Sequence, residues 1–252
     1  MKYNYRLVLQ YDGTRFNGWQ KQGNTDSTIQ GLLERKLSEH LKEKIDIKGS
    51  GRTDRGVHAA GQVANFYTTK RIESGQLKQW LNESLPEDIR VNEVEEVSLA
   101  FHSRKSATSK TYEYCIWNSQ EKNVFSNRYA YSVEPALNID KIKEAAKLLC
   151  GTHDFLGFCS LKESKKSTVR TLESIIIRQE NKKIYIQYKG NGFLYHMVRI
   201  LTGTLIEVGI GNMKPEEVET ILEEKNRNLA GQTVPSQGLK LLSVEYQGSR
   251  MT

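Results

Sequence analysis

The chain has 252 residues, the length of one large domain or two small ones, and its 37% hydrophobic and 27% charged residues are typical of a globular protein. Its apolar runs fall far short of the ~20 residues that a membrane span needs, and its start lacks the pattern of a signal peptide, so we expect a cytoplasmic protein with no membrane partner. The net charge of +7 favours a polyanionic partner, although a merely soluble basic protein would carry the same charge.

The first part of the sequence predicts strands and helices in the order β-α-β-β-α-β. Alternation of apolar and polar residues predicts four strands, at residues 5–12, 44–50, 60–68 and 88–97. Helical spacing of apolar residues predicts two helices, at residues 27–41 and 73–86. Ser27 or Thr28 is the candidate N-cap of the first helix, and Pro86 ends the second. This order is the split βαβ pattern of ferredoxin-like units.

The second part of the sequence has a similar order of elements. Strands are predicted at residues 109–118, 169–179, 182–190 and 239–247. Helices are predicted at residues 138–150, 192–209 and 214–225, with Gly151 just beyond the end of the first. We therefore predict an α+β fold of two ferredoxin-like (split βαβ) halves, residues 1–104 and 105–252, with their sheets side by side and a basic cleft between them.

The cysteines and histidines predict neither a disulfide framework nor a metal site. Three cysteines form no even set and no C-x-x-C motif, so they are expected to be reduced. Cys150, His153 and Cys159 lie close together in the sequence, but a fourth zinc ligand at suitable spacing is missing. No metal is expected.

The glycine-rich stretch GSGRTDRGVHAAGQVANF, residues 49–66, places one acid between two arginines. It matches neither G-x-x-x-x-G-K-[ST] nor G-x-G-x-x-G, so a nucleotide-phosphate loop is not expected. Asp54 is either a turn aspartate bound to its own backbone, or a carboxylate that Arg52 and Arg55 keep ionised for work as a nucleophile or base. His58 is either structural or an additional hydrogen-bond donor.

Arg199 is unusual because it interrupts a strongly apolar helical pattern. A guanidinium in such a helix needs an anion or water close by, since an unpaired buried charge is very costly. Asp54, from the other half of the chain, is an attractive partner. The alternative is that Arg199 lies on the solvent side of the helix, as most arginines do.

Two tyrosines of the strand predicted at 109–118 face the same side. Tyr112 and Tyr114 are two residues apart, and Lys105 and Lys110 lie close by in the sequence. An aromatic ring beside cations suits stacking on a nucleobase and binding of phosphates. Tyrosines that only pack on a sheet would show the same pattern.

Taken together, these segments resemble the tRNA pseudouridine synthase A family over nearly the whole chain. The matching segments include YDGTRFNGWQKQ, GRTDRGVHAAGQVANF, LPEDI, FHSRKSATSKTYEY, FLYHMVRILTGTLIEVG and GLKLLSVEY, in this order. The resemblance implies that Asp54 is the catalytic aspartate, that Arg199 pairs with it, and that Tyr112 stacks on the base. It also implies that Arg52 holds or displaces the target nucleotide.

The resemblance further implies a homodimer that converts uridine to pseudouridine in the anticodon arm of tRNA, at tRNA positions 38, 39 and 40, without cofactor or metal. We expect Arg55, His58 and Lys110 to contribute to substrate binding beside Tyr112 and Arg52. Two other classes are weighed against this one. A non-catalytic RNA-binding module would not need Asp54, and a phosphotransferase would need a lysine and Mg²⁺ ligands at spacings that the loop lacks.

Overall fold

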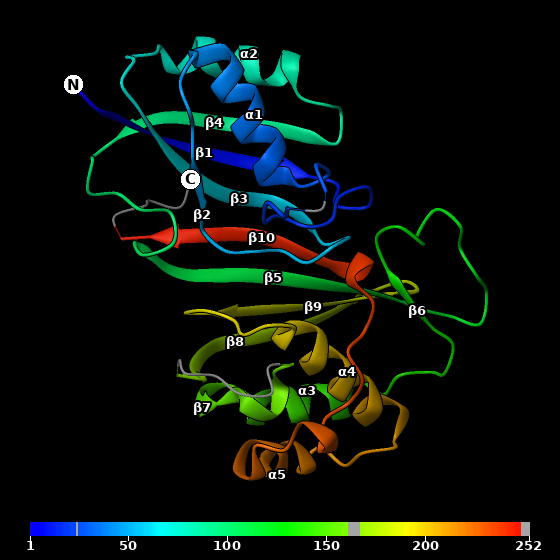
Figure 1. Ribbon diagram of the computed structural model, residues 1–252. Coiled ribbons are helices and arrows are strands. Elements are labelled where there is room, and N and C mark those ends of the chain that lie inside the picture. The colour runs from blue at the N-terminus through cyan, green and yellow to red at the C-terminus, as the bar shows by residue number, and fades with distance from the viewer. Residues whose placement is uncertain (24, 161–166, 248–252) are drawn as a thin grey trace. The chain divides into compact units, whose positions relative to one another are not determined.

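The computed structural model describes residues 1–23, 25–160 and 167–247 (Figure 1). Within them lie ten strands and five α-helices, which confirms the predicted mixed α+β class. The chain divides into two compact units. The first comprises Met1–Thr108 and the segment that begins at Lys240, and the second comprises Ser109–Leu239. The last strand thus joins the first unit, although it follows the second unit in the sequence.

The first unit contains a sheet covered by two helices. Its strands are β1 (Tyr3–Tyr11), β2 (Ile47–Gly49), β3 (His58–Thr68), β4 (Ile89–Val97) and β10 (Leu239–Tyr246). Its helices are α1 (Ile29–Leu41) and α2 (Ser74–Ser84). The strand order is β4-β1-β3-β10, with β2 also paired to β3. The β1 pairings with β3 and β4 are antiparallel, whereas β10 runs parallel to β3.

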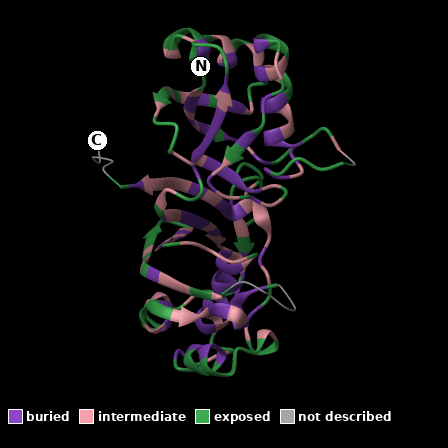
Figure 2. Ribbon diagram, turned by 60° about the vertical axis from the view of Figure 1, so that its left-hand side comes forward, coloured by how far each residue is buried: buried purple, intermediate pink, exposed green. Residues whose placement is uncertain are grey.

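The core of this unit follows from two different sequence periods. Buried side chains alternate along β1: Tyr5, Leu7, Leu9 and Tyr11. Buried side chains of α1 recur at helical spacing: Ile29, Leu33, Leu37 and Leu41. In Figure 2, which colours the ribbon by burial, buried segments run through the sheet and along the helices that cover it. Thr28 caps α1 as predicted, since its Oγ1 accepts the N–H of Gly31 at 3.3 Å.

The second unit also places helices against an antiparallel sheet. Its strands are β5 (Ala107–Asn118), β6 (Tyr131–Val133), β7 (Gly151–Asp154), β8 (Val169–Glu180) and β9 (Lys183–Gly190). Its α-helices are α3 (Ile139–Leu148), α4 (Met197–Ile210) and α5 (Glu217–Glu224). The strand order is β5-β9-β8-β7, with β6 paired in parallel to β5. The short strands β6 and β7 were not predicted, because three or four residues carry too little alternation to be recognised.

Helix α4 forms the centre of the second unit. Eleven of its fourteen residues are buried, so it is covered on nearly every side. It packs on the sheet, where the hydroxyl of Tyr188 on β9 shares a 2.8 Å hydrogen bond with Thr202. The predicted hairpin between β8 and β9 is confirmed: its two-residue loop includes Asn181 at a φ of +54°, as a tight hairpin turn requires.

The helix predicted at 192–209 begins later, at Met197. His196 adopts the left-handed conformation with a φ of +62°, which interrupts the helical path just before α4. Phe193, which the apolar pattern assigns to the helix, instead contacts the ring of Tyr112. A tertiary contact therefore decides the conformation of this segment, and residues 192–196 form the approach to α4.

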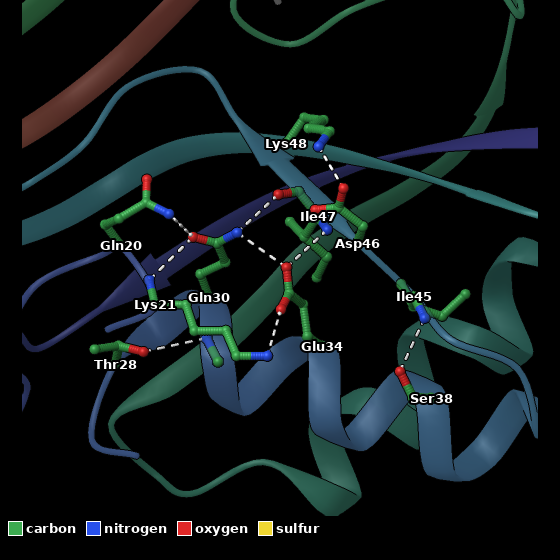
Figure 3. Close-up of polar contacts among 11 residues, drawn as sticks. Gln20, Lys21, Thr28, Gln30, Glu34, Ser38, Ile45, Asp46, Ile47 and Lys48 are labelled. Carbon is green, nitrogen blue, oxygen red and sulfur yellow. Dashed lines mark hydrogen bonds and ion pairs between the residues drawn. The ribbon is translucent and has the colours of Figure 1, made fainter. Parts of the chain in front are cut away.

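A buried carboxylate joins α1 to the segment that follows β1 (Figure 3). Glu34 on α1 accepts the backbone N–H of Ile47 at 3.1 Å and the side-chain amide of Gln30 at 2.9 Å. The oxygen of Gln30 in turn accepts from Gln20 Nε2 at 2.8 Å and from the backbone N–H of Lys21 at 3.1 Å. Glu34 and Gln30 therefore fix one end of the chain segment between β1 and α1 to the helix and to β2.

We predict that replacing Glu34 by Leu lowers the free energy of unfolding by about 2–4 kcal/mol, because the buried donors on Ile47 and Gln30 lose their acceptor. Urea unfolding measures this loss. Glu39→Leu is the matched control, since Glu39 lies on the same helix and is exposed. Its effect should stay within about 0.5 kcal/mol. Equal losses for the two variants would contradict a structural role for the Glu34 carboxylate.

Candidate active site

Asp54 lies on the connection between β2 and β3 of the first unit, within a β-turn. Its carbonyl accepts the N–H of Val57 at 3.1 Å. Gly56 has a φ of +78°, the left-handed value that the third position of a type II turn requires. Asp54 itself is half-buried, whereas Arg52 and Arg55 on either side are exposed. The turn therefore holds the acid partly covered and leaves both flanking guanidinium groups on the surface.

Two glycines of the segment after β1 bring its backbone directly against this turn. A Cβ on Gly13 would lie 2.0 Å from the carbonyl oxygen of Val57. A Cβ on Gly18, whose φ is +87°, would lie 2.6 Å from the carbonyl oxygen of Thr53. The backbone N–H of Trp19 also donates to that oxygen at 3.0 Å. No other residue type fits at either glycine without moving the backbone that carries Asp54.

A buried chain of polar side chains supports the turn from beneath. The hydroxyl groups of Tyr11 and Thr53 share a hydrogen bond of 2.8 Å. Gln62 on β3 donates to the Tyr11 oxygen at 3.3 Å and to the carbonyl of Gly51 at 3.1 Å. The hydroxyl of Ser50 donates to the Gln62 oxygen at 2.7 Å. Burial raises the pKa of Tyr11 to about 12, so its phenol stays neutral at physiological pH.

Sequence reasoning did not single out this supporting chain. Tyr11 and Thr53 lie within recognised motifs, but their residue types alone do not distinguish a structural hydrogen bond from a surface position. Gln62 offered the clearest signal, because it stands in the run AGQVANF, which is otherwise mostly apolar. A glutamine in a strand that is buried on both faces must find hydrogen-bond partners, and the partners here are the residues of the turn.

His58 lies at the start of β3 and is buried. Its Nδ1 is 3.1 Å from the backbone nitrogen of Gly13 and 3.2 Å from a carboxylate oxygen of Asp12. A neutral ring accepts the Gly13 N–H, and a protonated ring pairs with Asp12. The imidazole thus links the start of β3 to the residues that follow β1.

Tyr112 and Lys110 lie on the same face of β5 in the second unit. Tyr112 pairs with Tyr188 across the strands, and its ring meets the edge of Phe193 with centroids 5.1 Å apart. Tyr112 is 8% exposed, so its ring is buried. Lys110 is half-buried two residues along the strand. The contact with Phe193 orients the Tyr112 ring relative to the approach to α4.

Arg199 is half-buried on α4, and its Nε donates to the carbonyl of Val234 at 2.7 Å. The hydroxyl of Tyr114 donates to the next carbonyl, that of Pro235, at 2.7 Å. Burial raises the pKa of Tyr114, and the positive charge of Arg199 partly offsets this effect. Two successive carbonyls thus hold the arginine and the tyrosine beside each other. The guanidinium has a backbone partner and does not simply extend into solvent.

Residues 231–235, which carry the carbonyls of Val234 and Pro235, pack closely against α4. A Cβ on Gly203 would lie 1.9 Å from the carbonyl oxygen of Gln232. The N–H of Gly231 donates to the hydroxyl of Thr204 at 3.0 Å. Sequence reasoning missed residues 231–235, because the segment acts through its backbone and its side chains suggest no chemistry.

The residues predicted from the sequence fall into two sets. Asp54, Arg52, Arg55 and His58 lie in the first unit, and Tyr112, Lys110 and Arg199 lie in the second.

Cys150 and His153, which lie close together in the sequence, make local contacts. His153 Nε2 lies 3.0 Å from the carbonyl oxygen of Cys150, and the Cys150 thiol donates to the carbonyl of Ala146 at 3.4 Å. Across residues 1–23, 25–160 and 167–247, no group of three or more His, Cys, Asp or Glu side chains is placed to hold a metal ion.

In the same ranges, none of the helices is both long and apolar enough for a membrane span.

Comparison with known proteins identifies the family. A family described as "tRNA pseudouridine synthase" matches residues 7–104 and 145–247. The chain is 46% identical over 243 residues to tRNA pseudouridine synthase A 2 of Bacillus cereus (strain ZK / E33L), covering 96% of this chain and 99% of the relative. It is 49% identical over 228 residues to tRNA pseudouridine synthase A of Bacillus sp. (strain KSM-64), with coverages of 90% and 93%.

A relative from another organism is similar over the same length. The chain is 43% identical over 243 residues to tRNA pseudouridine synthase A of Acetivibrio thermocellus, covering 96% of this chain and 99% of the relative. The resemblance first seen in the motifs is therefore confirmed along nearly the full length. The chain belongs to the tRNA pseudouridine synthase family and is an isomerase of the pseudouridine synthase type.

Proposed function

We propose that this enzyme converts uridine to pseudouridine at positions 38, 39 and 40 in the anticodon arm of tRNA, with Asp54 as the nucleophile. The observation that carries the proposal is the way in which neighbouring residues fix the turn that carries Asp54. Asp54 is half-buried, and the backbone at Gly13 and Gly18 packs against its turn. The side chains of Tyr11 and Gln62 form hydrogen bonds with the residues that precede Asp54. The names of the relatives support tRNA as the substrate.

The reaction rearranges one nucleotide without net loss or gain of atoms. The N1–C1′ bond of uridine breaks and a C5–C1′ bond forms, while C5 loses a proton and N1 gains one. Nothing is oxidised or reduced, so no redox or group-transfer cofactor is required. The enzyme must instead detach the base, turn it and hold it in place. A carboxylate assists detachment by attacking carbon or by taking a proton from the sugar.

Asp54 performs this step in the proposal, and Arg199 pairs with it across the two units. The rigid turn would keep the carboxylate in one position, because a catalytic group contributes most when its geometry is fixed before the substrate binds. The carbonyl of Val234 fixes Arg199 in the same way. The pairing of these two charges would keep the acid ionised and aimed at the nucleotide.

The remaining predicted residues act on the RNA. Tyr112 lies against the uracil ring and limits its movement while it is detached. Arg52 fills the space that the flipped nucleotide leaves, and Arg55 and Lys110 bind phosphates. His58 keeps the Asp54 turn in place through Gly13. We further propose that the enzyme acts in the cytoplasm as a homodimer and binds the RNA in a basic cleft between two ferredoxin-like halves.

Asp54→Asn should abolish turnover, by at least about a thousandfold, while the affinity for tRNA stays within about twofold, because shape and hydrogen bonding are nearly kept. Tritium release from tRNA that carries 5-tritiated uridine measures turnover, and filter binding measures affinity. Asp46→Asn serves as the control, since Asp46 is an exposed acid of the same unit. Appreciable tritium release by pure Asp54→Asn enzyme would refute the nucleophile, and normal turnover by both variants would favour another acid.

Arg199→Leu should remove activity without unfolding the protein, because leucine fits the apolar surroundings of α4. Arg199→Lys should recover little, since an ammonium group cannot bind Val234 and a carboxylate with the same fork. Single-turnover rates and thermal unfolding midpoints of both variants test this expectation. Undiminished rates for Arg199→Leu would show that Asp54 does not depend on this arginine.

The affinity for tRNA should fall at least about tenfold between 50 and 200 mM salt, because phosphate contacts release counterions. Arg55→Ala should reduce the slope of log Kd against log salt by about 0.7–0.9, the amount for one lost phosphate contact. Arg35→Ala is the control, since Arg35 is exposed on α1. A flat salt response of the unaltered enzyme would contradict binding through phosphates. Equal slopes for Arg55→Ala and Arg35→Ala would show that Arg55 does not contact a phosphate.

A further inference from the structure

The approach to α4 presents an exposed aromatic pair that none of the proposed roles uses. Tyr195 is 45% exposed, and its ring stacks on His196 with centroids 3.7 Å apart and planes 27° from parallel. Large exposed aromatic side chains are costly to hold in one orientation unless a contact fixes them. The exposed but ordered position of the Tyr195 ring therefore needs a physical explanation.

The structure fixes this pair through Ser160. The backbone N–H of Ser160 donates to the carbonyl of Tyr195 at 3.2 Å, and the Ser160 hydroxyl lies 2.9 Å from His196 Nδ1. His196 also holds a left-handed backbone, which is unfavourable for a residue with a side chain. These contacts hold the two rings face to face at the surface before any partner binds.

The position of the pair ties it to the proposed site. Phe193, two residues earlier, contacts Tyr112, and Arg199 lies four residues after Tyr195 on α4. Two residues of extended chain span at most about 7 Å. The exposed ring therefore belongs to the same short segment that orients Tyr112 and begins the helix of Arg199.

We infer that Tyr195, backed by His196, is a second stacking surface for the RNA, which binds a nucleobase next to the reacting uridine. This inference rests on the proposed function. Turning a uridine out of its stack leaves the neighbouring bases with uncovered faces. A fixed aromatic ring covers such a face without regard to sequence, because every base has a π-face. His196 extends the aromatic surface and keeps Tyr195 from turning away.

The test measures binding of a synthetic anticodon stem-loop RNA. Tyr195→Ala should raise Kd about tenfold, the expected loss for one stacked base. Tyr195→Phe should bind within about twofold of the unaltered enzyme, because the ring is kept. Tyr129→Ala is the matched control, since Tyr129 is 50% exposed in the same unit. Thermal unfolding midpoints within a few degrees show that each variant folds.

A second measurement reports stacking directly. Tyr195→Trp should show tryptophan emission that the RNA quenches, beyond the quenching seen for the unaltered enzyme with its three native tryptophans. The inference would be overturned if Tyr195→Ala bound the RNA as tightly as the unaltered enzyme, or if Tyr195→Ala and Tyr129→Ala weakened RNA binding equally. It would also be overturned if the RNA quenched the emission of Tyr195→Trp no more than that of the unaltered enzyme. Failure of the proposed function is separate, because it appears as absence of tritium release from tRNA by the unaltered enzyme.

Discussion

The close approach of two backbone segments is the constraint on which the first unit's candidate site depends. Gly13 and Gly18 leave no room for a side chain between the segment after β1 and the turn that carries Asp54. This contact costs conformational entropy, because glycine is the residue that loses most freedom on folding. The network of Glu34 and Gln30 offsets part of that cost by anchoring the same segment to α1 and β2. The acid is thus held by backbone contacts with little freedom to move.

In the second unit, backbone carbonyls fix the candidate residue Arg199, whereas close backbone packing fixes Asp54 in the first. Arg199 and Tyr114 come from a helix and a strand, and neither could be placed by its own element alone. The successive carbonyls of Val234 and Pro235 bind both, and the contact of Gly203 with Gln232 keeps that segment against α4. The carbonyl of Val234 therefore fixes the direction of Arg199.

Periodic and capped elements were predictable from the sequence, whereas contacts made by backbone were not. The period of α1 and its cap Thr28 are local properties, and so is the hairpin at Asn181. The start of α4 depends on the packing of Phe193 against Tyr112, which no local pattern contains.

The candidate residues divide in the same way. Asp54 was recognisable because an acid between two arginines in a glycine-rich turn is unusual. Gln62 is less conspicuous, although it supports the turn, because its role appears only when β3 is buried on both faces. The carbonyl of Val234 carries no signal in residue type at all. Chemistry that resides in side chains can be read from sequence, and chemistry that resides in backbone geometry requires coordinates.

The placement of β10 has a consequence for how the protein is made. This strand pairs with β3 at His58 and Ala59, and the carbonyl of Leu242 lies where a side chain on Gly61 would be. A ribosome synthesises residues 239–246 only after the second unit, so the edge of β3 at His58 and Ala59 stays without β10 throughout that synthesis. Unpaired strand edges of this kind invite association with other chains. β10 therefore pairs with β3 only after the second unit has been synthesised, although β3 belongs to the unit that is made first.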